Sequence, residues 1–478
     1  MRDNVTNFEN FDPKISSNRY HRSILNNSII LILFDSLVFS FSLIFGNYLL
    51  LLINGIEFSI VNGWLIVPAW VLFSFLNKLL PCWGVGIVDE IQKIQKTLFF
   101  MFALILITSF LSKIEFSSSR IVFVFSYLFS AIFIPVVRRL VRKYFSNNGL
   151  WGVPVAIYGS EKDILDCIKL LNSDLALGYI PSSAFVSKNE SISSIGKLDV
   201  LGTFNDVDVN SPIGIVLQGS LSNKEYLNII DKAGSCYKRL IIIPEIISGA
   251  SLWVTPIDFQ GTLGLEITKN LLNPFSKKLK ILCDYFFVIL LFPIWLLVIL
   301  IIGLLIIFED GKNPLFFQER IGEEGKIFNT IKFRTMVPDA ESKLKLALEN
   351  NKNLLDEWNK SYKLKKDPRI TKVGKILRIT SLDELPQLFN VLNGTMSVVG
   401  PRPLPIYHFQ ELPNYVQDLR NKVKPGITGL WQVSGRSETG TSGMKKWDPY
   451  YVRNWSIWLD IVILFKTIKA VFSAKGAY

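Results

Sequence analysis

Two adjacent carboxylates, Asp383 and Glu384, stand at the centre of the segment Thr380-Ser381-Leu382-Asp383-Glu384-Leu385-Pro386-Gln387. Ser381 followed three residues later by Glu384 has the form of a capping box, which predicts that a helix begins here. Acidic side chains in the first turn of a helix interact favourably with its dipole, so a lone pair of this kind is most often an ordinary helix start. The neighbouring motifs decide whether the pair has a chemical role instead.

Cationic side chains accompany the acidic pair in short, motif-like segments. Lys332 and Arg334 lie upstream in Lys332-Phe333-Arg334-Thr335-Met336, Arg378 precedes Asp383 by five residues, and Arg402 follows in Gly400-Pro401-Arg402-Pro403. A carboxylate among cations stays ionised and can attack phosphorus, while the cations neutralise the transferred group. A second carboxylate beside it can hold Mg²⁺, which prefers oxygen ligands shared with substrate phosphates. The combination predicts phosphate chemistry.

Composition excludes several other classes of site. The four cysteines are far apart with no CxxC, which argues against a disulfide framework or a zinc site, and the two histidines make a histidine general base a poor expectation. The 478 residues are 49% hydrophobic with a net charge of +12, which suits nucleic acid or anionic lipid equally well. The apolar segments favour lipid, so no nucleic-acid partner is expected.

Four apolar segments, near 29–53, 60–80, 97–112 and 119–137, follow a polar and mobile tail over 1–22. They predict a four-span transmembrane bundle over 23–145, although the third segment is shorter than the roughly 20 residues that a bilayer requires. The first segment is too long for a cleavable signal peptide and has no small-residue cleavage site.

Charge predicts the orientation of this bundle. Basic residues precede the first segment and follow the fourth, whereas the connection over 54–62 has no Lys or Arg, so both ends of the bundle are expected in the cytoplasm. Asp35 within the first segment is a functional candidate by default, with packing or snorkelling as the alternative.

Residues 151–270 predict a small α/β domain. Val153 to Tyr158, Ile215 to Gln218 and Leu240 to Pro244 have the pattern of buried strands, with helical stretches between them, as in half of a Rossmann unit. The turn after the first of these strands has the single glycine Gly159 and no GxGxxG, which is weak support for phosphate binding. The expected role is assembly or regulation, with nucleotide sensing as the alternative.

Ile281 to Phe308 form an apolar run broken by one charge, Asp284. The run is long enough to cross a bilayer, and hydropathy alone predicts a fifth span that would put the acidic pair outside the cell. Pro293 interrupts the run near its middle, where proline breaks a helix.

Two further segments predict helices. Residues 343–366 are rich in Lys and Glu and predict an exposed amphipathic helix. Residues 455–473 carry an apolar stripe from Trp455 to Phe472 that suits an interfacial helix or a core helix, the interfacial placement being preferred.

Residues 275–478 resemble the catalytic domain of the bacterial sugar transferases, the monotopic phosphoglycosyl transferases. The stretches that carry this resemblance are Phe317 to Gly322, Lys332 to Met336, Asp367 to Thr371, Arg378 to Leu388, Met396 to Pro403 and Lys424 to Arg436. With its four spans, its middle domain and its ending from Asp448-Pro449-Tyr450-Tyr451 to Gly476-Ala477-Tyr478, the whole chain resembles the long form of the family, the undecaprenyl-phosphate galactose phosphotransferases.

The resemblance implies a membrane protein of the α plus α/β class. A four-helix transmembrane bundle, a Rossmann-like middle domain and a catalytic domain would follow one another. In the catalytic domain, a re-entrant helix hairpin over 279–308 would enter and leave the bacterial inner membrane from the cytoplasmic face, keeping the accessory and catalytic domains in the cytoplasm.

The resemblance also implies the reaction. A UDP-sugar would deliver its sugar-1-phosphate to undecaprenyl phosphate, releasing UMP and initiating a lipid-linked polysaccharide such as O-antigen, capsule or exopolysaccharide. Asp383 would be the nucleophile that forms a phosphosugar-enzyme intermediate, and Glu384, with Asp383, would bind Mg²⁺. The candidates for binding phosphate or substrate are Lys332, Arg334, Arg369, Arg378, Arg402, Gly426 and Gly429, and Arg320 is a further candidate. Tight-turn geometry explains the two glycines nearly as well.

The chain departs from the family pattern at two positions. Thr395 replaces the usual Asp of Gly-Asp-Met-Ser, which puts identical Mg²⁺ binding in doubt, and Phe292-Pro293 replaces the usual Ser-Pro.

Several alternatives stay open at this stage. A glucose-specific transferase of the same family, a membrane nucleotide-sugar epimerase or dehydratase, and a non-enzymatic scaffold or chain-length regulator are the rivals. Galactose is the favoured sugar, and a homodimer is a further expectation.

Overall fold

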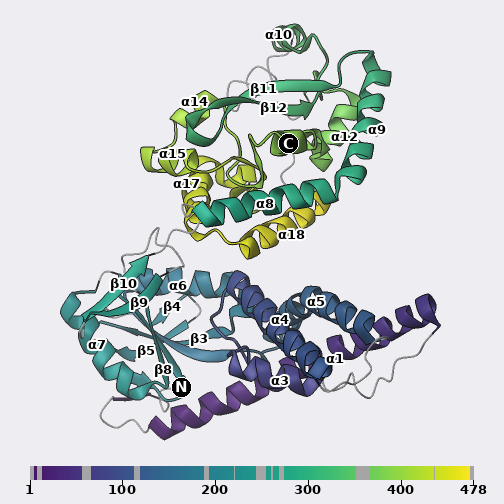
Figure 1. The fold of residues 1–478 in the computed structure, drawn as a ribbon. Helices are drawn as coiled ribbons and strands as arrows, with labels where there is room; N and C mark the ends of the chain where they lie inside the picture. Colours follow the sequence, from purple (N-terminus) through teal and green to yellow (C-terminus); the bar gives the residue numbers. More distant parts are fainter. Residues whose placement is uncertain are drawn as a thin grey trace. The chain divides into compact units, whose positions relative to one another are not determined.

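The computed structural model describes residues 5–7, 13–55, 66–111, 119–187, 193–196, 198–219, 221–243, 254–259, 262–267, 274–350, 367–434 and 436–473. The chain divides into two compact units, Met1–Ser248 and Gly249–Tyr478 (Figure 1). The first unit contains the apolar helices of the N-terminal half and a parallel sheet. The second contains the acidic pair. The boundary at 248 falls inside the predicted middle domain of 151–270.

The helices of the first unit are α1 (Pro13–Asn54), α3 (Ile66–Leu76), α4 (Ile87–Leu111) and α5 (Ser119–Asn147). Three of them include stretches long and apolar enough to cross a membrane, Tyr20–Ile53, Ile87–Thr108 and Val122–Asn147. The prediction of a second span over 60–80 is not met by the described part of α3, whose 11 residues are too few. Residues 60–65 lie outside the described residues.

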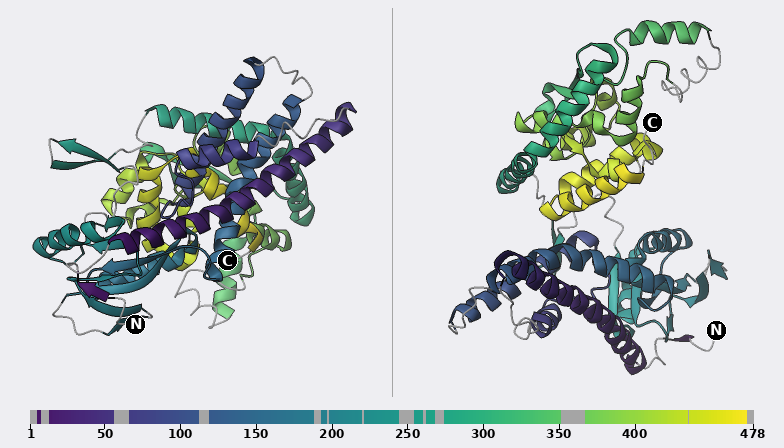
Figure 2. Two further views of the ribbon diagram at one scale, coloured as in Figure 1. Left: turned by 90° about the horizontal axis from the view of Figure 1, so that it is seen from below. Right: turned by 90° about the vertical axis from the view of Figure 1, so that its right-hand side faces the viewer.

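The prediction of a mobile tail over 1–22 is wrong for the described part of this segment. Val5–Asn7 form strand β1, which pairs antiparallel with β6 (Asp206–Asp208), and α1 begins at Pro13. Helix α1 has 42 residues, which at 1.5 Å each is about 63 Å, twice the thickness of the hydrocarbon core. Figure 2 shows it as one continuous helix. Only part of α1 can therefore lie in lipid, because the rest extends past the apolar layer.

A buried charge cluster connects the bundle helices. Asp35 and Arg138 are both completely buried, and Nη2 of Arg138 lies 2.5 Å from Oδ2 of Asp35. Nε1 of Trp70 donates to the same carboxylate at 2.8 Å, while Arg142 pairs with Glu90 at 2.6 Å. Every charge in this cluster is paired. This favours the packing alternative for Asp35 over a functional role.

The sheet of the first unit has the order β4-β5-β3-β2-β7-β8. Its strands are β2 (Val153–Tyr158), β3 (Tyr179–Val186), β4 (Ser194–Ile195), β5 (Leu198–Thr203), β7 (Ile213–Leu217) and β8 (Arg239–Ile243), all parallel except β4. Helices α6 (Glu161–Ser173) and α7 (Asn223–Cys236) connect them. The parallel strands, taken in chain order, lie as 3-2-1-4-5, which is the Rossmann order.

The topological switch point of this sheet lies between β2 and β7, where a nucleotide phosphate would bind in a Rossmann protein. Here Oγ of Ser160 donates to Oδ2 of Asp163 at 2.6 Å. A Cβ atom on Gly219 would lie 1.9 Å from the same oxygen, so the carboxylate fills the space against the β7 turn. An acidic group in this position repels a diphosphate, which weighs against the nucleotide-binding rivals.

The bundle and the sheet share one hydrophobic core. Leu31 of α1, Trp83 and Trp151 pack with the buried face of β2 and β7, and Oδ1 of Asn27 accepts a hydrogen bond from the Gly152 amide at 2.9 Å. The first unit is therefore not a bundle joined flexibly to a middle domain.

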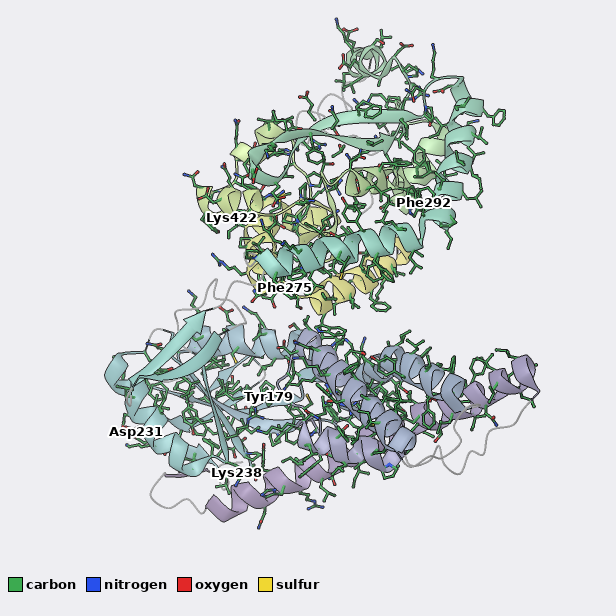
Figure 3. The ribbon with its side chains drawn as sticks, viewed as in Figure 1. Tyr179, Asp231, Lys238, Phe275, Phe292 and Lys422 are labelled. Carbon is green, nitrogen blue, oxygen red and sulfur yellow. The ribbon has the colours of Figure 1, made fainter. Side chains whose placement is uncertain are left out.

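The second unit begins with a hairpin of β9 (Val254–Phe259) and β10 (Thr262–Ile267), followed by two apolar helices. Helix α8 (Pro274–Leu290) and helix α9 (Phe292–Asp310) are separated at Leu291, with Pro293 in the first turn of α9, where its missing amide costs no hydrogen bond. The predicted break at Pro293 thus occurs, between two helices. In Figure 3, Phe275 lies at the start of α8 and Phe292 at the start of α9.

The remaining elements surround these helices. They are β11 (Leu315–Ile321), β12 (Ile327–Phe333), α10 (Ala340–Asn350), α12 (Lys372–Thr380), the 3₁₀ turn η7 (Leu382–Glu384), α13 (Gln387–Leu392), β13 (Ser397–Val399), α14 (Ile406–Gln410), α15 (Asn414–Asn421), β14 (Gly426–Thr428), α16 (Leu430–Val433), α17 (Arg436–Asn454) and α18 (Ile457–Ser473). Strands β11 and β12 are antiparallel, and β13 runs parallel to β14. Helix α10 accounts for the start of the predicted helix over 343–366, whose residues 351–366 lie outside the described part.

Helix α9 has a buried side and a wide apolar exposed side. Trp295, Ile299, Ile302 and Ile306 pack into the core of the unit, whereas other large apolar residues of the helix, among them Leu297 and Leu304, are exposed. Helix α9 is also long and apolar enough to cross a membrane.

The apolar stripe predicted over 455–473 is buried in its first half and exposed in its second half. Trp455, Leu459 and Val462 are buried, but Phe465 and Ile468 are more than half exposed. The first half of the stripe packs in the core, and only the second half has the exposure that an interfacial helix needs.

Candidate active site

The acidic pair lies in the 3₁₀ turn η7, between the end of α12 and the start of α13. Ser381 has φ 57°, in the left-handed region, and its amide donates back to the carbonyl of Arg378 at 3.3 Å, which closes α12. The predicted capping box is wrong because Ser381 ends one helix and makes no side-chain cap for the next. The turn directs two consecutive carboxylates toward side chains of other elements.

Glu384 is held by two cations from different parts of the chain. Nζ of Lys332, on β12, lies 2.7 Å from Oε1 of Glu384. Arg402, which follows β13, donates from Nη2 to Oε1 at 2.6 Å and from Nη1 to Oε2 at 3.3 Å. Three segments far apart in sequence therefore meet at one carboxylate.

The two acids have opposite electrostatic environments. Burial alone would raise the pKa of Glu384, but the charges of Arg402 and Lys332, and their hydrogen bonds, lower this pKa to about 2. Burial, together with the negative charge of Glu384, raises the pKa of Asp383 to about 6, although Lys332, Arg378 and Arg402 act against this rise. No hydrogen bond or ion pair to the Asp383 carboxylate occurs among the described residues.

Arg378 is held close to Asp383 by Thr335, which lies just after the strand that carries Lys332. Nε of Arg378 donates to Oγ1 of Thr335 at 2.9 Å, and its charge acts on both Asp383 and Asp367. Gly374 packs directly on the backbone of Thr335, where a Cβ atom would lie 2.2 Å from the carbonyl oxygen. Thr335 and Gly374 thus support the site. The only sequence signal for Thr335 was its place beside Lys332 and Arg334.

A second buried support holds Arg402. Nη2 of Arg420 donates to the backbone carbonyl of Arg402, and Nη1 of Arg420 pairs with the buried carboxylate of Asp448. Asp448 belongs to the Asp448-Pro449-Tyr450-Tyr451 stretch, to which the sequence alone assigned no role.

Arg320 also lies in this cationic region. Burial, followed by the charge of Arg402, lowers the pKa of Arg320, and its Nη1 atom is buried without a hydrogen-bond partner among the described residues. An unpaired guanidinium nitrogen beside a second guanidinium suits a bound anion.

Two of the predicted phosphate ligands pair with other acids. Nη2 of Arg334 lies 2.7 Å from Oδ1 of Asp310, at the end of α9, and Nη2 of Arg369 lies 2.6 Å from Oδ2 of Asp367. The structure therefore brings Lys332, Arg378 and Arg402 to the acidic pair but gives Arg334 and Arg369 different carboxylate partners.

Gly426 and Gly429 both approach the backbone of Gly400. A Cβ atom on Gly426 would lie 2.0 Å from the Gly400 amide nitrogen, and one on Gly429 would lie 2.1 Å from the Gly400 carbonyl oxygen. The Gly426 amide already donates to the carbonyl of Pro401 at 2.9 Å. This arrangement favours the packing alternative for these glycines, because they set the position of the loop that carries Arg402.

The model of the Bacterial sugar transferase family matches residues 275–474 of the chain. The undecaprenyl-phosphate galactose phosphotransferase of Salmonella typhimurium is 33% identical over 431 residues, covering 87% of this chain and 86% of that protein. This chain belongs to the bacterial sugar transferase family. Its predicted identity as an enzyme of this family is confirmed.

Two further relatives differ in how much of this chain they match. The UDP-glucose:undecaprenyl-phosphate glucose-1-phosphate transferase of Klebsiella pneumoniae is 31% identical over 97% of this chain and 100% of its own length. The exopolysaccharide production protein ExoY of Sinorhizobium fredii is 40% identical over 88% of its own length but only 42% of this chain. Long relatives of either sugar thus resemble this transferase.

The acidic pair of the transferase could hold Mg²⁺ only together with substrate phosphates and water. Both oxygens of Glu384 already lie within hydrogen-bonding distance of cations, which disfavours Glu384 as the main ligand. No cluster of three His, Cys, Asp or Glu side chains that could hold a metal occurs among the described residues. Mg²⁺ often binds through one or two carboxylates, with water and substrate phosphates completing its shell. Asp383 would be the protein ligand in such an arrangement.

Thr395, at the position of the usual family Asp, hydrogen-bonds with Asn390 of α13. Its Oγ1 donates to the carbonyl of Asn390 at 3.1 Å and accepts from Nδ2 of Asn390 at 3.3 Å. Asn390 in turn bonds the β12 backbone at Asn329 and Ile331. Thr395 therefore supports Asn390, which joins α13 to the strand that carries Lys332.

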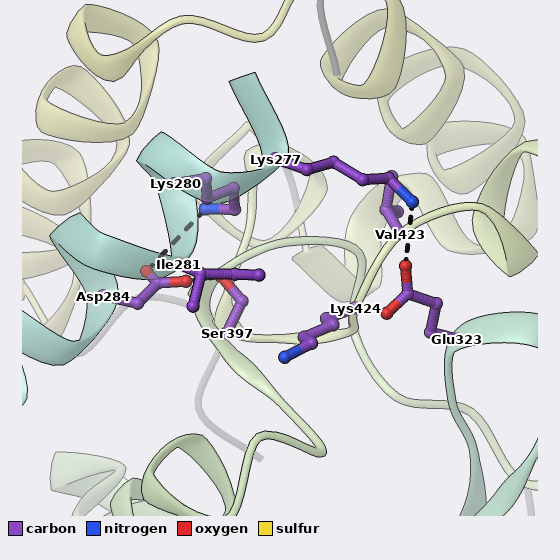
Figure 4. A pocket seen from close by; sticks show the side chains of 8 residues that line it. All are labelled: Lys277, Lys280, Ile281, Asp284, Glu323, Ser397, Val423 and Lys424. Atoms are coloured by element: carbon purple, nitrogen blue, oxygen red, sulfur yellow. Dashed lines mark hydrogen bonds and ion pairs between the residues drawn. The ribbon is translucent and has the colours of Figure 1, made fainter. Parts of the chain in front are cut away.

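A small pocket of the transferase lies at the start of α8 and is lined by Lys277, Lys280, Ile281, Asp284, Glu323, Ser397, Val423 and Lys424 (Figure 4). Lys277 pairs with Glu323 at 3.0 Å and Lys280 with Asp284 at 3.8 Å. Lys280 also contacts Asp460 at 2.8 Å. Acids thus neutralise two of the three lysines, and this cluster joins the start of α8 to the rest of the unit.

Proposed function

We propose that this transferase moves a sugar-1-phosphate from a UDP-sugar to undecaprenyl phosphate and releases UMP. The observation that supports the proposal best is the asymmetry of the acidic pair. Glu384 is fixed between Lys332 and Arg402, while the carboxylate of Asp383 faces the same cations without a hydrogen bond or ion pair among the described residues. One acid thus organises positive charge, and its neighbour is left to react.

The reaction proceeds in two displacements at one phosphorus. A carboxylate oxygen of Asp383 attacks the sugar-bearing phosphorus of the UDP-sugar, and the bond from that phosphorus to the bridging oxygen breaks as UMP leaves. An oxygen of undecaprenyl phosphate then attacks the aspartyl phosphosugar and releases the Asp383 carboxylate. The product is undecaprenyl diphosphate sugar. Two steps suit a soluble donor and a lipid acceptor, because each can occupy the site in turn.

The side chains act on charge and position. Lys332, Arg378 and Arg402 offset the negative charge of the transferred phosphoryl group, and Arg320 provides a further guanidinium beside Arg402. We propose Mg²⁺ as cofactor, held by the substrate diphosphate and Asp383, where it would neutralise charge on the leaving UMP.

We propose that α8 and α9 form a re-entrant hairpin in the bacterial inner membrane. The proposal is supported by the break at Leu291, the exposed apolar side of α9 and the exposed Phe465 and Ile468 on α18. A hairpin of this kind keeps the acidic pair on the cytoplasmic side, where nucleotide sugars occur. The basic ends of α1 and α5 support the same side for the first unit.

Galactose is the proposed sugar, with glucose as the second candidate because relatives that act on either sugar match most of the chain. The deciding experiment measures UMP release by the purified full chain with undecaprenyl phosphate and Mg²⁺. UDP-galactose and UDP-glucose are compared, with Asp383→Asn as control. Release from one sugar only, lost in the variant, is the expected result. Undiminished release by Asp383→Asn would overturn the proposed nucleophile, and no release from any UDP-sugar would overturn the proposed reaction.

A further inference from the structure

The last two residues of α9, Glu309 and Asp310, contact two separate elements of the active site. Oε1 of Glu309 accepts a hydrogen bond from the amide of Lys372 at 2.8 Å, and Oε2 accepts one from the amide of Val373 at 3.3 Å. Asp310 pairs with Arg334, two residues beyond Lys332. The end of an apolar helix is thus joined to α12 and to the segment after β12.

Glu309 completes the cap of α12. Thr371, the N-cap residue of this helix, accepts a hydrogen bond from the Gly374 amide at 2.9 Å, and the amide of Lys375 donates to the Thr371 carbonyl. The amides of Lys372 and Val373 have no partner within their own helix, since the first amides of any helix lack one. Glu309 supplies both partners from another helix, and its negative charge interacts favourably with the N-terminal end of the α12 dipole.

Helix α12 depends on such contacts because it is short. It has nine residues, fewer than the roughly 12–15 that an isolated helix needs to be even marginally stable in water. Its position is therefore set by tertiary contacts at each end. Glu309 holds the N-terminal end, and Thr335 contacts Gly374 and Arg378 further along.

The other end of α12 leads directly into the acidic pair. Arg378 lies in its last turn, Ser381 closes the helix, and Asp383 follows two residues later. A shift of α12 would move Arg378 and the η7 turn together, whereas Lys332 and Arg402 are carried by other elements. Displacements of about 1 Å at a reacting group can cost a hundredfold in rate.

We infer that Glu309 is a positioning residue for the proposed transfer reaction: through α12 it sets the place of Arg378 and Asp383. The inference rests on the proposed function. It adds that the C-terminal end of α9, the helix proposed to lie in the membrane, holds α12 in place, and α12 leads into the proposed nucleophile Asp383.

The kinetic test compares Glu309→Ala and Glu309→Gln in the full chain. The control is Glu341→Ala, which removes an exposed acid from the first turn of α10, away from the site. We expect kcat for UMP release to fall about tenfold in Glu309→Ala, and about threefold in Glu309→Gln, which keeps one acceptor oxygen. KM for the UDP-sugar should change less than about twofold, because Lys332 and Arg402 are not moved.

The balance of the two kinetic constants distinguishes positioning from a loss of stability. Unfolding lowers the amount of active enzyme, whereas a displaced α12 lowers kcat per folded molecule while KM stays near the wild-type value. Unchanged kcat in Glu309→Ala would overturn the inference. So would a fall in kcat that disappears when the rates are normalised to the amount of folded protein.

Hydrogen exchange provides a readout that does not depend on activity. Loss of the cap should increase exchange of amides in α12 of Glu309→Ala, while Glu341→Ala should match the wild type there. Equal exchange in Glu309→Ala and the wild type would overturn the capping step. Suppose that the wild type releases no UMP, but the α12 amides exchange faster in Glu309→Ala than in the wild type. That result would overturn the proposed function and leave the capping step standing.

Discussion

Arg402 contacts the carboxylate of Glu384 with both terminal nitrogens, at 2.6 Å and 3.3 Å, whereas burial, together with the charge of Glu384, raises the pKa of the neighbouring Asp383. Charge-assisted, two-point contacts of this kind fix geometry as well as charge. The loop that carries Arg402 is itself set by the packing of Gly426 and Gly429 on Gly400. In this arrangement Glu384 holds two cations beside Asp383, the proposed nucleophile.

The rate should depend on pH through Asp383. Its pKa is raised to about 6, and a carboxylate in its proposed role as nucleophile must be deprotonated, so the active form is complete well above that value and is lost as pH falls through it. At pH 5 about one tenth of the molecules would carry ionised Asp383. Single-turnover UMP release measured between pH 4.5 and 8 should follow this limb, with stability checked at each pH. A flat profile down to pH 5 would contradict the assignment.

Lys332→Ala should affect both the rate and its pH dependence. The ammonium group pairs with Glu384 and lowers the pKa of Asp383. Its loss should reduce kcat by about 10²–10³-fold, as removal of one preorganised charge-stabilising group typically does, and should move the acidic limb to higher pH. The matched control is Lys326→Ala on the same hairpin, whose exposed ion pair with Glu324 should leave the rate unchanged. Equal rates in the two variants would refute the role of Lys332.

Asp35→Asn should destabilise the bundle strongly. The change leaves Arg138 buried without its charged partner, and breaking a buried ion pair in this way typically costs about 3–5 kcal/mol. Asp174→Asn is the control, because its pair with Arg139 is largely exposed and is worth at most about 1 kcal/mol. Thermal unfolding of the two variants in the same detergent makes the comparison. Similar midpoints for both variants would mean that the buried cluster does not stabilise the bundle.

Thr395→Val should lower stability without changing the response to Mg²⁺. The hydroxyl group bonds Asn390 in both directions, and losing such bonds typically costs about 1 kcal/mol. Because Thr395 makes these bonds with a structural asparagine, the Mg²⁺ concentration for half-maximal rate should stay within about twofold of the wild-type value. A large increase in that concentration would show instead that the hydroxyl group replaces the usual family Asp as a metal ligand.

The sequence predicted the elements whose pattern is local. The strand over Val153–Tyr158 and the break beside Pro293 follow from runs of apolar residues and from the geometry of proline, which need no distant partner. Helix boundaries were less accurate. Helix α1 begins at Pro13 and α5 continues to Asn147 because contacts with the sheet and the buried charge cluster stabilise polar turns that hydropathy leaves out.

The sequence by itself determined that this chain is a membrane transferase with an acidic pair among cations, because residue types and their order carry that information. Only the tertiary structure decided which cation meets which acid. Arg402 and Lys332 reach Glu384, whereas Arg334 and Arg369 pair with Asp310 and Asp367. The form S-x-x-E predicted an N-cap at Ser381, but α12 extends to Thr380, so Ser381 is the C-cap of that helix. The pairings between cations and acids are different in kind. Such pairings depend on distances between segments far apart in the chain, which spacing along the sequence does not contain.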